Sequence, residues 1–241
     1  METLPDRIAA IRAQIAAAAA RSGRDPAAIQ LIGVSKTHPA ATVLAARAAG
    51  IDAFGENRVQ EAEAKIAALA HQQPPPQWHL IGHLQRNKAR RAAQIFDLIH
   101  SLDSLALAQS LDRHAAEAKR MLPVLLQVNV SGEASKDGFE LANWQNDQQA
   151  RDTFFALVEQ ILALPQIRVR GLMTIAPYTP DPAAARSVFA STRALRDALA
   201  DRFADTAWHE LSMGMSDDFA VAIEAGATMV RVGRALFGAR G

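Results

Sequence analysis

Residues 29–58 read IQLIGVSKTHPAATVLAARAAGIDAFGENR, and this stretch decides the fold. It opens with a short run of leucine and β-branched residues, continues through an alanine-rich segment, and returns to a second short apolar run. A strand, a helix and a strand in this order form the repeating unit of a parallel sheet covered by helices. The sequence therefore predicts an α/β fold.

The same alternation continues to the end of the chain. Short apolar runs predict eight strands, at residues 29–35, 53–54, 79–81, 98–101, 124–130, 169–174, 210–212 and 229–232. Helices are expected to begin near Pro39, Arg58, Asn87, Ser104, Asn143, Pro182 and Ser216. Pro39 and Pro182 suit a first helical turn. The polar stretch 139–152 is expected to be an irregular insertion, and a further helix over residues 4–22 precedes the first strand.

Eight strands with interleaved helices predict a single (β/α)8 (TIM) barrel domain over residues 1–241. In such a barrel the functional residues lie on the loops that follow the carboxyl ends of the strands. Those loops are therefore where the chemistry of this chain is expected.

Composition and charge restrict the function. The chain has no cysteine, which removes disulfides, thiolate metal sites and a cysteine nucleophile. Its formal net charge is +1, with lysine and arginine spread along the chain, so no nucleic-acid partner is expected. The apolar segment 15–20 is too short for a membrane span or a signal core. We therefore expect a soluble cytoplasmic protein that does not bind a membrane.

Lys36 directly follows the first predicted strand. Side chains alternate across a strand, so Lys36 shares a face with Ile32 and Val34. If that face lines the barrel, the amine points into the barrel mouth. A partly desolvated lysine there can act as a nucleophile towards an aldehyde. Taken alone, the same run also fits a solvated lysine that only ends a strand.

The loops after the last two strands, within residues 212–218 and 231–234, are candidates for a phosphate site. Gly214 and Gly233 would allow backbone amides to approach a ligand closely. Ser216 could instead cap a helix, with the two following aspartates complementing the helix dipole. Those two carboxylates would repel a phosphate unless they point away from it.

Polar residues also follow the second, third and fifth predicted strands, at 55–58, 79–88 and 131–138. His79 and His83 have the spacing of a helical metal-binding pair, but they flank the end of a strand, where that spacing does not bring two rings together. We therefore expect no metal site.

Together these segments resemble the pyridoxal phosphate homeostasis protein family, relatives of the N-terminal barrel of alanine racemase. The stretches that carry the resemblance are residues 31–36, 54–58, 79–88, 101–103, 128–138, 171–176, 211–218 and 230–238. They recur in order through almost the whole chain, so the resemblance is specific.

The resemblance implies that the chain binds pyridoxal 5′-phosphate through a Schiff base with Lys36. It implies phosphate contacts from Ser216 and from the backbone of Gly233 and Arg234, and it places Arg231 at the pyridine nitrogen. The residues implied in cofactor binding are Lys36, Asn57, Met213, Ser216, Arg231, Gly233 and Arg234.

For function, the resemblance implies intracellular homeostasis of the cofactor, with the protein carrying or buffering it and meeting pyridoxal-phosphate-dependent apoenzymes transiently. A racemase-like enzyme is the alternative, and it would need a second proton-transfer group opposite the lysine. In the racemase relatives a tyrosine from a further C-terminal domain supplies that group across a dimer. The only tyrosine here is Tyr178, which the sequence alone cannot place opposite Lys36.

Two further expectations follow. Because the chain ends after the eighth strand and its short helix, without the second racemase domain, we expect a monomer that is not an enzyme. Besides the carrier and the racemase-like enzyme, a third possible function keeps the barrel and the phosphate site without the cofactor. The protein would then be an isomerase or aldolase of phosphorylated sugars.

Overall fold

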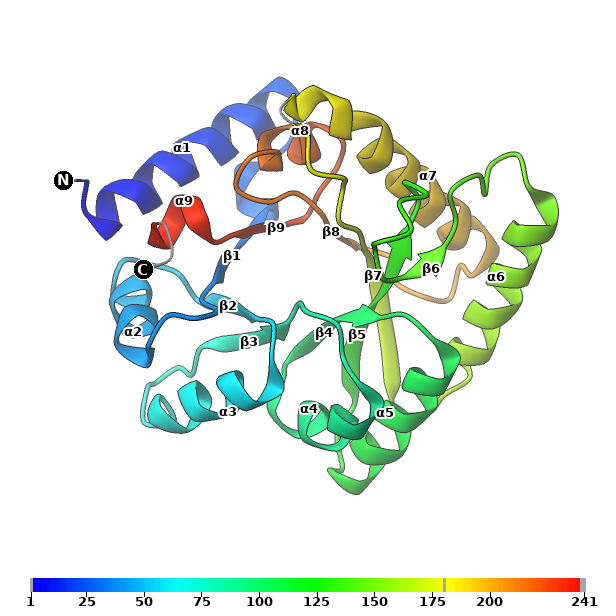
Figure 1. Cartoon of the computed structure of the whole chain (residues 1–241), viewed down its shortest axis with the longest axis horizontal. Helices are drawn as coiled ribbons and strands as arrows, with labels where there is room; N and C mark the ends of the chain where they lie inside the picture. The colour runs from blue at the N-terminus through cyan, green and yellow to red at the C-terminus, as the bar shows by residue number, and fades with distance from the viewer. Residues whose placement is uncertain (1, 180, 239–241) are drawn as a thin grey trace.

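The barrel predicted from the sequence is confirmed (Figure 1). The computed structural model describes residues 2–179 and 181–238. Within them eight parallel strands follow each other in the order β4-β3-β2-β1-β9-β8-β7-β5, and pairing between β4 and β5 closes the ring. The barrel strands are β1 (Gln30–Val34), β2 (Ala53–Glu56), β3 (Gln77–Leu80), β4 (Leu98–Leu102), β5 (Leu122–Asn129), β7 (Ile167–Met173), β8 (Glu210–Ser212) and β9 (Met229–Val232).

Helices surround the strands on the outside of the ring (Figure 1). They are α2 (Ala40–Ala48), α3 (Val59–Ala68), α4 (Ala89–Ile95), α5 (Leu105–Glu117), α6 (Gln148–Leu162), α7 (Arg186–Arg202), α8 (Phe219–Glu224) and α9 (Arg234–Phe237). Short 3-10 turns at Pro26–Ala28, Arg86–Lys88 and Pro182–Ala185 precede β1, α4 and α7. No helix in the described part of the chain is both long enough and apolar enough to cross a bilayer.

The predicted N-terminal helix is α1 (Leu4–Arg21), which packs against α8 and α9 (Figure 1). Thr3 starts it with a capping box: its hydroxyl accepts the Asp6 N–H, and the Asp6 carboxylate accepts the Thr3 N–H. Its buried residues recur every three or four positions, which gives the helix one apolar face. Since α8 and α9 have only six and four residues, α1 completes the helical layer on this side.

Two expected helix starts were wrong, and one proline lies just before the helical turn expected to contain it. α6 begins at Gln148 instead of near Asn143, because the insertion first forms the two-residue strand β6 (Phe139–Glu140) beside β5, and Asp147 caps the helix. α8 begins at Phe219, so Ser216 is not its N-cap. Pro39 precedes the first turn of α2 instead of lying in it.

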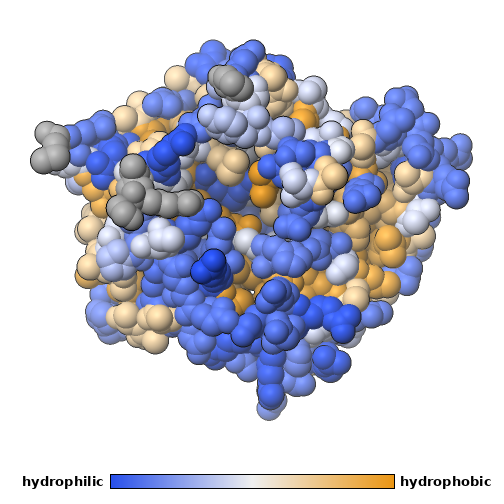
Figure 2. All heavy atoms as spheres, viewed as in Figure 1, coloured by the Kyte–Doolittle hydropathy of each residue, from blue (hydrophilic) through white to orange (hydrophobic). Residues whose placement is uncertain are grey.

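The strands are buried on both faces, as parallel strands covered by helices must be. A small apolar cluster fills the inside of the barrel and consists of Ile32, Ala53, Leu98, Leu125, Met173 and Met229. The face of β1 that carries Ile32 is therefore the inner face, as expected for Lys36. Hydrophilic residues predominate on the side of the molecule seen in Figure 2, with apolar atoms exposed in small areas between them.

Candidate functional site

The predicted site residues follow neighbouring strands. The sheet order β2-β1-β9-β8 makes neighbours of loops that are far apart in the sequence. Asn57 follows β2, Lys36 follows β1, Gly233 follows β9 and Ser216 follows β8. All of these strands are parallel, so their carboxyl ends lie at the same edge. The structure therefore brings these residues together on one arc of the barrel mouth.

Lys36 is half-buried and lies in the turn between β1 and α2. Gly233 lies across from Val34 on the neighbouring strand: a β-carbon at position 233 would lie 3.4 Å from the Val34 β-carbon. Its φ of −112° is accessible to any residue, so the backbone conformation does not require glycine here. What glycine contributes is the space that a side chain would otherwise fill. A side chain at this position would pack against Val34, two residues before Lys36.

The loops after β8 and β9 present unused donors. The Ser216 hydroxyl oxygen accepts the Ala235 N–H at 3.3 Å, which ties the two loops together. Among the described residues, no acceptor is bonded to the backbone N–H groups of Ser216, Gly233 or Arg234. Converging backbone N–H groups in glycine-containing loops suit a phosphate.

The two aspartates that follow Ser216 are already engaged. Asp217 accepts from the Arg234 guanidinium with both carboxylate oxygens at 2.5 Å. Asp218 accepts the Met215 N–H at 2.6 Å, and burial raises the pKa of Asp218. The charge of Asp217 is thus compensated by Arg234, and the Asp218 carboxylate is held by a backbone N–H of its own loop, which weakens the main objection to an anion site here.

Arg231 is 3% exposed and lies inside the barrel. Its guanidinium donates to the Ser212 hydroxyl at 2.6 Å and to the Thr174 carbonyl at 2.8 Å. Burial lowers the pKa of Arg231 to about 10, so it stays protonated at neutral pH. A protonated guanidinium can only donate, and here two acceptors hold its orientation.

A buried chain of hydrogen bonds extends from Arg231 across the barrel. The Ser212 hydroxyl lies 2.8 Å from His100 Nδ1, and His100 Nε2 lies 2.9 Å from His79 Nδ1. Because Ser212 accepts from Arg231, its own proton is available to His100 Nδ1. His100 then carries its proton on Nε2 and donates it to His79. In this tautomer each group donates to the next one outward from the arginine.

Sequence reasoning missed this chain. It considered His79 only with His83, but His83 is exposed at the surface, 3.1 Å from Asp103. The available signal was that His79 and His100 both occupy positions that point into the barrel, on the adjacent strands β3 and β4. Only the register of these strands shows that the two rings meet. Nowhere in residues 2–179 and 181–238 do three or more His, Asp or Glu side chains form a group that could hold a metal ion.

The buried histidines predict a loss of stability in mild acid. Burial lowers the pKa of His79 to about 4, and burial, with the charges of His79 and Arg231 nearby, holds the pKa of His100 well below its ordinary value. The unfolded chain therefore binds more protons than the folded one between pH 6.5 and 4. We expect the free energy of unfolding to fall as pH drops through this window, by about 3 kcal/mol from His79 alone.

Urea unfolding at pH 7 and pH 4.5 measures this loss. His79→Gln should flatten the dependence, whereas His71→Gln, at an exposed histidine, should leave it unchanged. If the free energy of unfolding falls equally between pH 7 and pH 4.5 in both variants, the buried histidine pair is not the cause of the loss.

Asn57, Met213 and Tyr178 differ in how far they are exposed. Asn57 is half-buried at the mouth, and Gly82 packs directly on its backbone. Met213 is fully buried in the main apolar cluster, so its side chain does not line the mouth. Tyr178 is 82% exposed and lines a shallow hollow with Lys136 and Met215 at the rim.

The sequence is similar to characterised proteins over its whole length. The family pattern of the alanine racemase N-terminal domain matches residues 7–241. The pyridoxal phosphate homeostasis protein of Pseudomonas aeruginosa is 47% identical over 240 residues, covering 100% of this chain and 97% of that protein. The Escherichia coli protein of the same name is 40% identical over 245 residues, covering 100% and 98%.

Solved structures agree with these matches. PipY of Synechococcus elongatus is 42% identical, and the alignment covers 98% of this chain and 100% of PipY, with TM-scores of 0.85 to the form without pyridoxal phosphate and 0.83 to the form with it bound. Alanine racemase of Streptomyces coelicolor is 19% identical with a TM-score of 0.69, over 96% of this chain and 58% of the racemase, and shares the fold.

Proposed function

The chain belongs to the pyridoxal phosphate homeostasis protein family and carries the alanine racemase N-terminal domain, and from this premise we propose that it binds pyridoxal 5′-phosphate at the barrel mouth. Lys36 would hold the aldehyde carbon covalently. The PLP-bound form of PipY supports the choice of ligand.

One observation carries the proposal. The strand order β2-β1-β9-β8 places an amine after β1 on the same arc as unused backbone N–H groups after β8 and β9. The ligand carries an aldehyde and a phosphorylated methylene group on adjacent carbons of a pyridine ring, so an amine and an anion cradle on one arc match these two groups. The lack of a side chain at Gly233, beside Val34, leaves the ring the space that a β-carbon would take there.

The residues would divide the binding among them. Gly233, Arg234 and Ser216 would hold the phosphate, and the fixed guanidinium of Arg231 would donate to the ring nitrogen. Asn57 would contact the ligand from the β2 side, while Met213 would act through the backbone of its loop, because its side chain is buried in the core. When bound, the ligand supplies an electrophilic carbon for amines and an electron sink.

We further propose that the protein carries or buffers the ligand and does not catalyse a reaction with it. A racemase needs a second proton-transfer group opposite the lysine. The tyrosine of this chain has its side chain 82% exposed at the rim, which does not suit that task. An accessible covalent site suits delivery of the ligand to apoenzymes instead.

A visible spectrum of the purified protein with added pyridoxal 5′-phosphate, before and after borohydride, tests the binding proposal. We expect a visible band that borohydride removes, and a peptide map with the reduced adduct on Lys36. Pyridoxal without the phosphate should bind more weakly. A colourless protein, or equal binding of pyridoxal, would contradict the proposal.

For catalysis, we expect negligible exchange of the α-proton of added alanine with deuterated solvent over minutes. Arg231 only donates and thus suits an unprotonated ring nitrogen, which makes a weaker electron sink than a pyridinium. Proton NMR of alanine in deuterium oxide measures the exchange. Rapid exchange that disappears in Lys36→Ala would identify an enzyme.

A further inference from the structure

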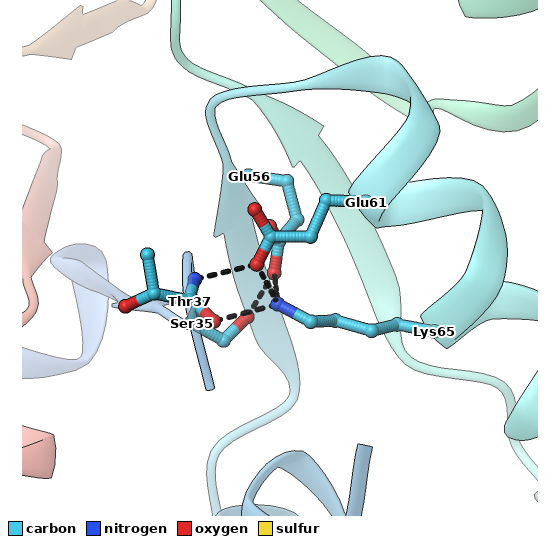
Figure 3. Close-up of polar contacts among 5 residues, drawn as sticks. All are labelled: Ser35, Thr37, Glu56, Glu61 and Lys65. Atoms are coloured by element: carbon cyan, nitrogen blue, oxygen red, sulfur yellow. Dashed lines mark hydrogen bonds and ion pairs between the residues drawn. The ribbon is translucent and has the colours of Figure 1, made fainter. Parts of the chain in front are cut away.

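A buried ion cluster lies between the barrel wall and α3, on the outer side of β1 and β2 (Figure 3). The Lys65 ammonium is almost fully buried. It donates to Glu56 Oε1 at 2.6 Å, to Glu61 Oε1 at 2.7 Å and to the Ser35 carbonyl at 2.7 Å. An ammonium group has three hydrogens, so every one of them is used.

The cluster holds both peptide groups that flank Lys36. The Ser35 carbonyl, which accepts from Lys65, belongs to the peptide before the Lys36 α-carbon. The Thr37 N–H, which donates to Glu61 Oε1 at 2.5 Å, belongs to the peptide after it. The two backbone dihedrals of Lys36 are rotations between these two peptide planes, so fixing both planes fixes the direction in which its Cα–Cβ bond leaves the turn; Figure 3 shows the bonds that hold the two planes.

The turn needs such support. Thr37 has a φ of 68°, which is unfavourable for a β-branched residue. Strained residues of this kind persist where the surrounding structure determines them, and they gather at functional sites. The bond from the Thr37 N–H to Glu61 opposes relaxation of this turn, together with the backbone bond from the His38 N–H to the Ser35 carbonyl.

Packing alone does not account for the cluster. Glu56 is fully buried, and burial raises the pKa of its carboxyl group despite hydrogen bonds from Lys65 and the Ser35 hydroxyl. Replacing a buried ion pair with apolar side chains is often neutral or stabilising, so its retention needs another reason. Its bonds to the two peptides beside Lys36 provide one.

We propose that Glu61, Lys65 and Glu56 are positioning residues that aim the Lys36 amine into the barrel mouth. The inference rests on the proposed function, since it assigns them to covalent capture of the aldehyde by Lys36. They act through the backbone of the turn and do not touch the ligand.

Glu61→Ala tests the positioning role, because Glu61 is partly exposed and its loss removes the acceptor for Thr37. We expect the rate of borohydride-trapped adduct formation to fall about tenfold, as for a lost hydrogen bond to a charged group. Affinity for 4-deoxypyridoxine 5′-phosphate, which has the ring and the phosphate but no aldehyde, should not change. Glu61→Gln keeps an acceptor oxygen and should recover most of the rate.

The chain offers a matched control in Glu63→Ala, on the same helix and paired with the surface residue Arg91. It should have the unsubstituted rate. If Glu61→Ala does not fold, Lys65→Met combined with Glu56→Gln removes a buried charge pair together and should lower the adduct rate in the same way.

The outcomes separate the two proposals. Absence of any adduct on Lys36 in the unsubstituted protein overturns the proposed function and the positioning role with it. A normal adduct there, with an unchanged rate in Glu61→Ala, overturns the positioning role alone. Equal losses of adduct rate and of 4-deoxypyridoxine 5′-phosphate affinity also overturn it, because the defect would then involve the whole mouth.

Discussion

Lys36→Ala is expected to abolish the borohydride-stable adduct with pyridoxal 5′-phosphate while leaving the fold intact. The lysine is half-buried at the end of a strand, outside the apolar clusters, so truncation removes little packing. Intact-protein mass after reduction measures the adduct, and thermal unfolding checks the fold. Weak reversible binding should survive, because the loops after β8 and β9, which we propose to hold the phosphate, are unchanged.

Lys136→Ala provides the control for that loss. Lys136 is also half-buried at the rim of the mouth, after β5, but it follows a strand outside the arc that carries Lys36. We expect Lys136→Ala to keep the main adduct. If the adduct instead persists in Lys36→Ala and maps to Lys136, the assignment of Lys36 is wrong.

The fold could be predicted because its signals are local. Strand runs and capping residues such as Ser104, which accepts the Leu107 N–H at the start of α5, can be read from a few consecutive residues. The second strand was harder. It extends through Gly55 and Glu56, which have little preference for strand structure, because the strands on both sides pair with it.

The candidate site could be predicted from the sequence only where a residue follows a strand. The location of Lys36, Ser216 and Gly233 at the barrel mouth was predicted this way, since the carboxyl ends of barrel strands lie at one edge. Contacts that join separate elements were missed. The distances from His79 to His100, and from Lys65 to Ser35, depend on strand register and on the rotation of α3, and a single sequence specifies neither. A lysine on the apolar face of α3 was the one available hint.

Gly171→Ala is expected to destabilise the protein by more than about 4 kcal/mol, the range reached only by substitutions with a severe structural cause. Gly171 has a φ of 154° and pairs with Glu210 in the ladder between β7 and β8. A β-carbon there would lie 1.9 Å from the Glu210 carbonyl oxygen. That oxygen belongs to backbone that cannot rotate away, so β8 must shift as a whole.

Such a shift should also reach the loop that we propose to bind the phosphate, because β8 leads into the loop that carries Ser216. We therefore expect whatever folded protein remains to bind pyridoxal 5′-phosphate weakly. Gly23→Ala is the matched control: its φ is also positive, at 66°, but nothing lies within 4 Å of the added carbon. It should cost only the local strain of about 1–2 kcal/mol. Urea unfolding of the two variants decides the matter, since equal stabilities would mean that the ladder between β7 and β8 does not run as described.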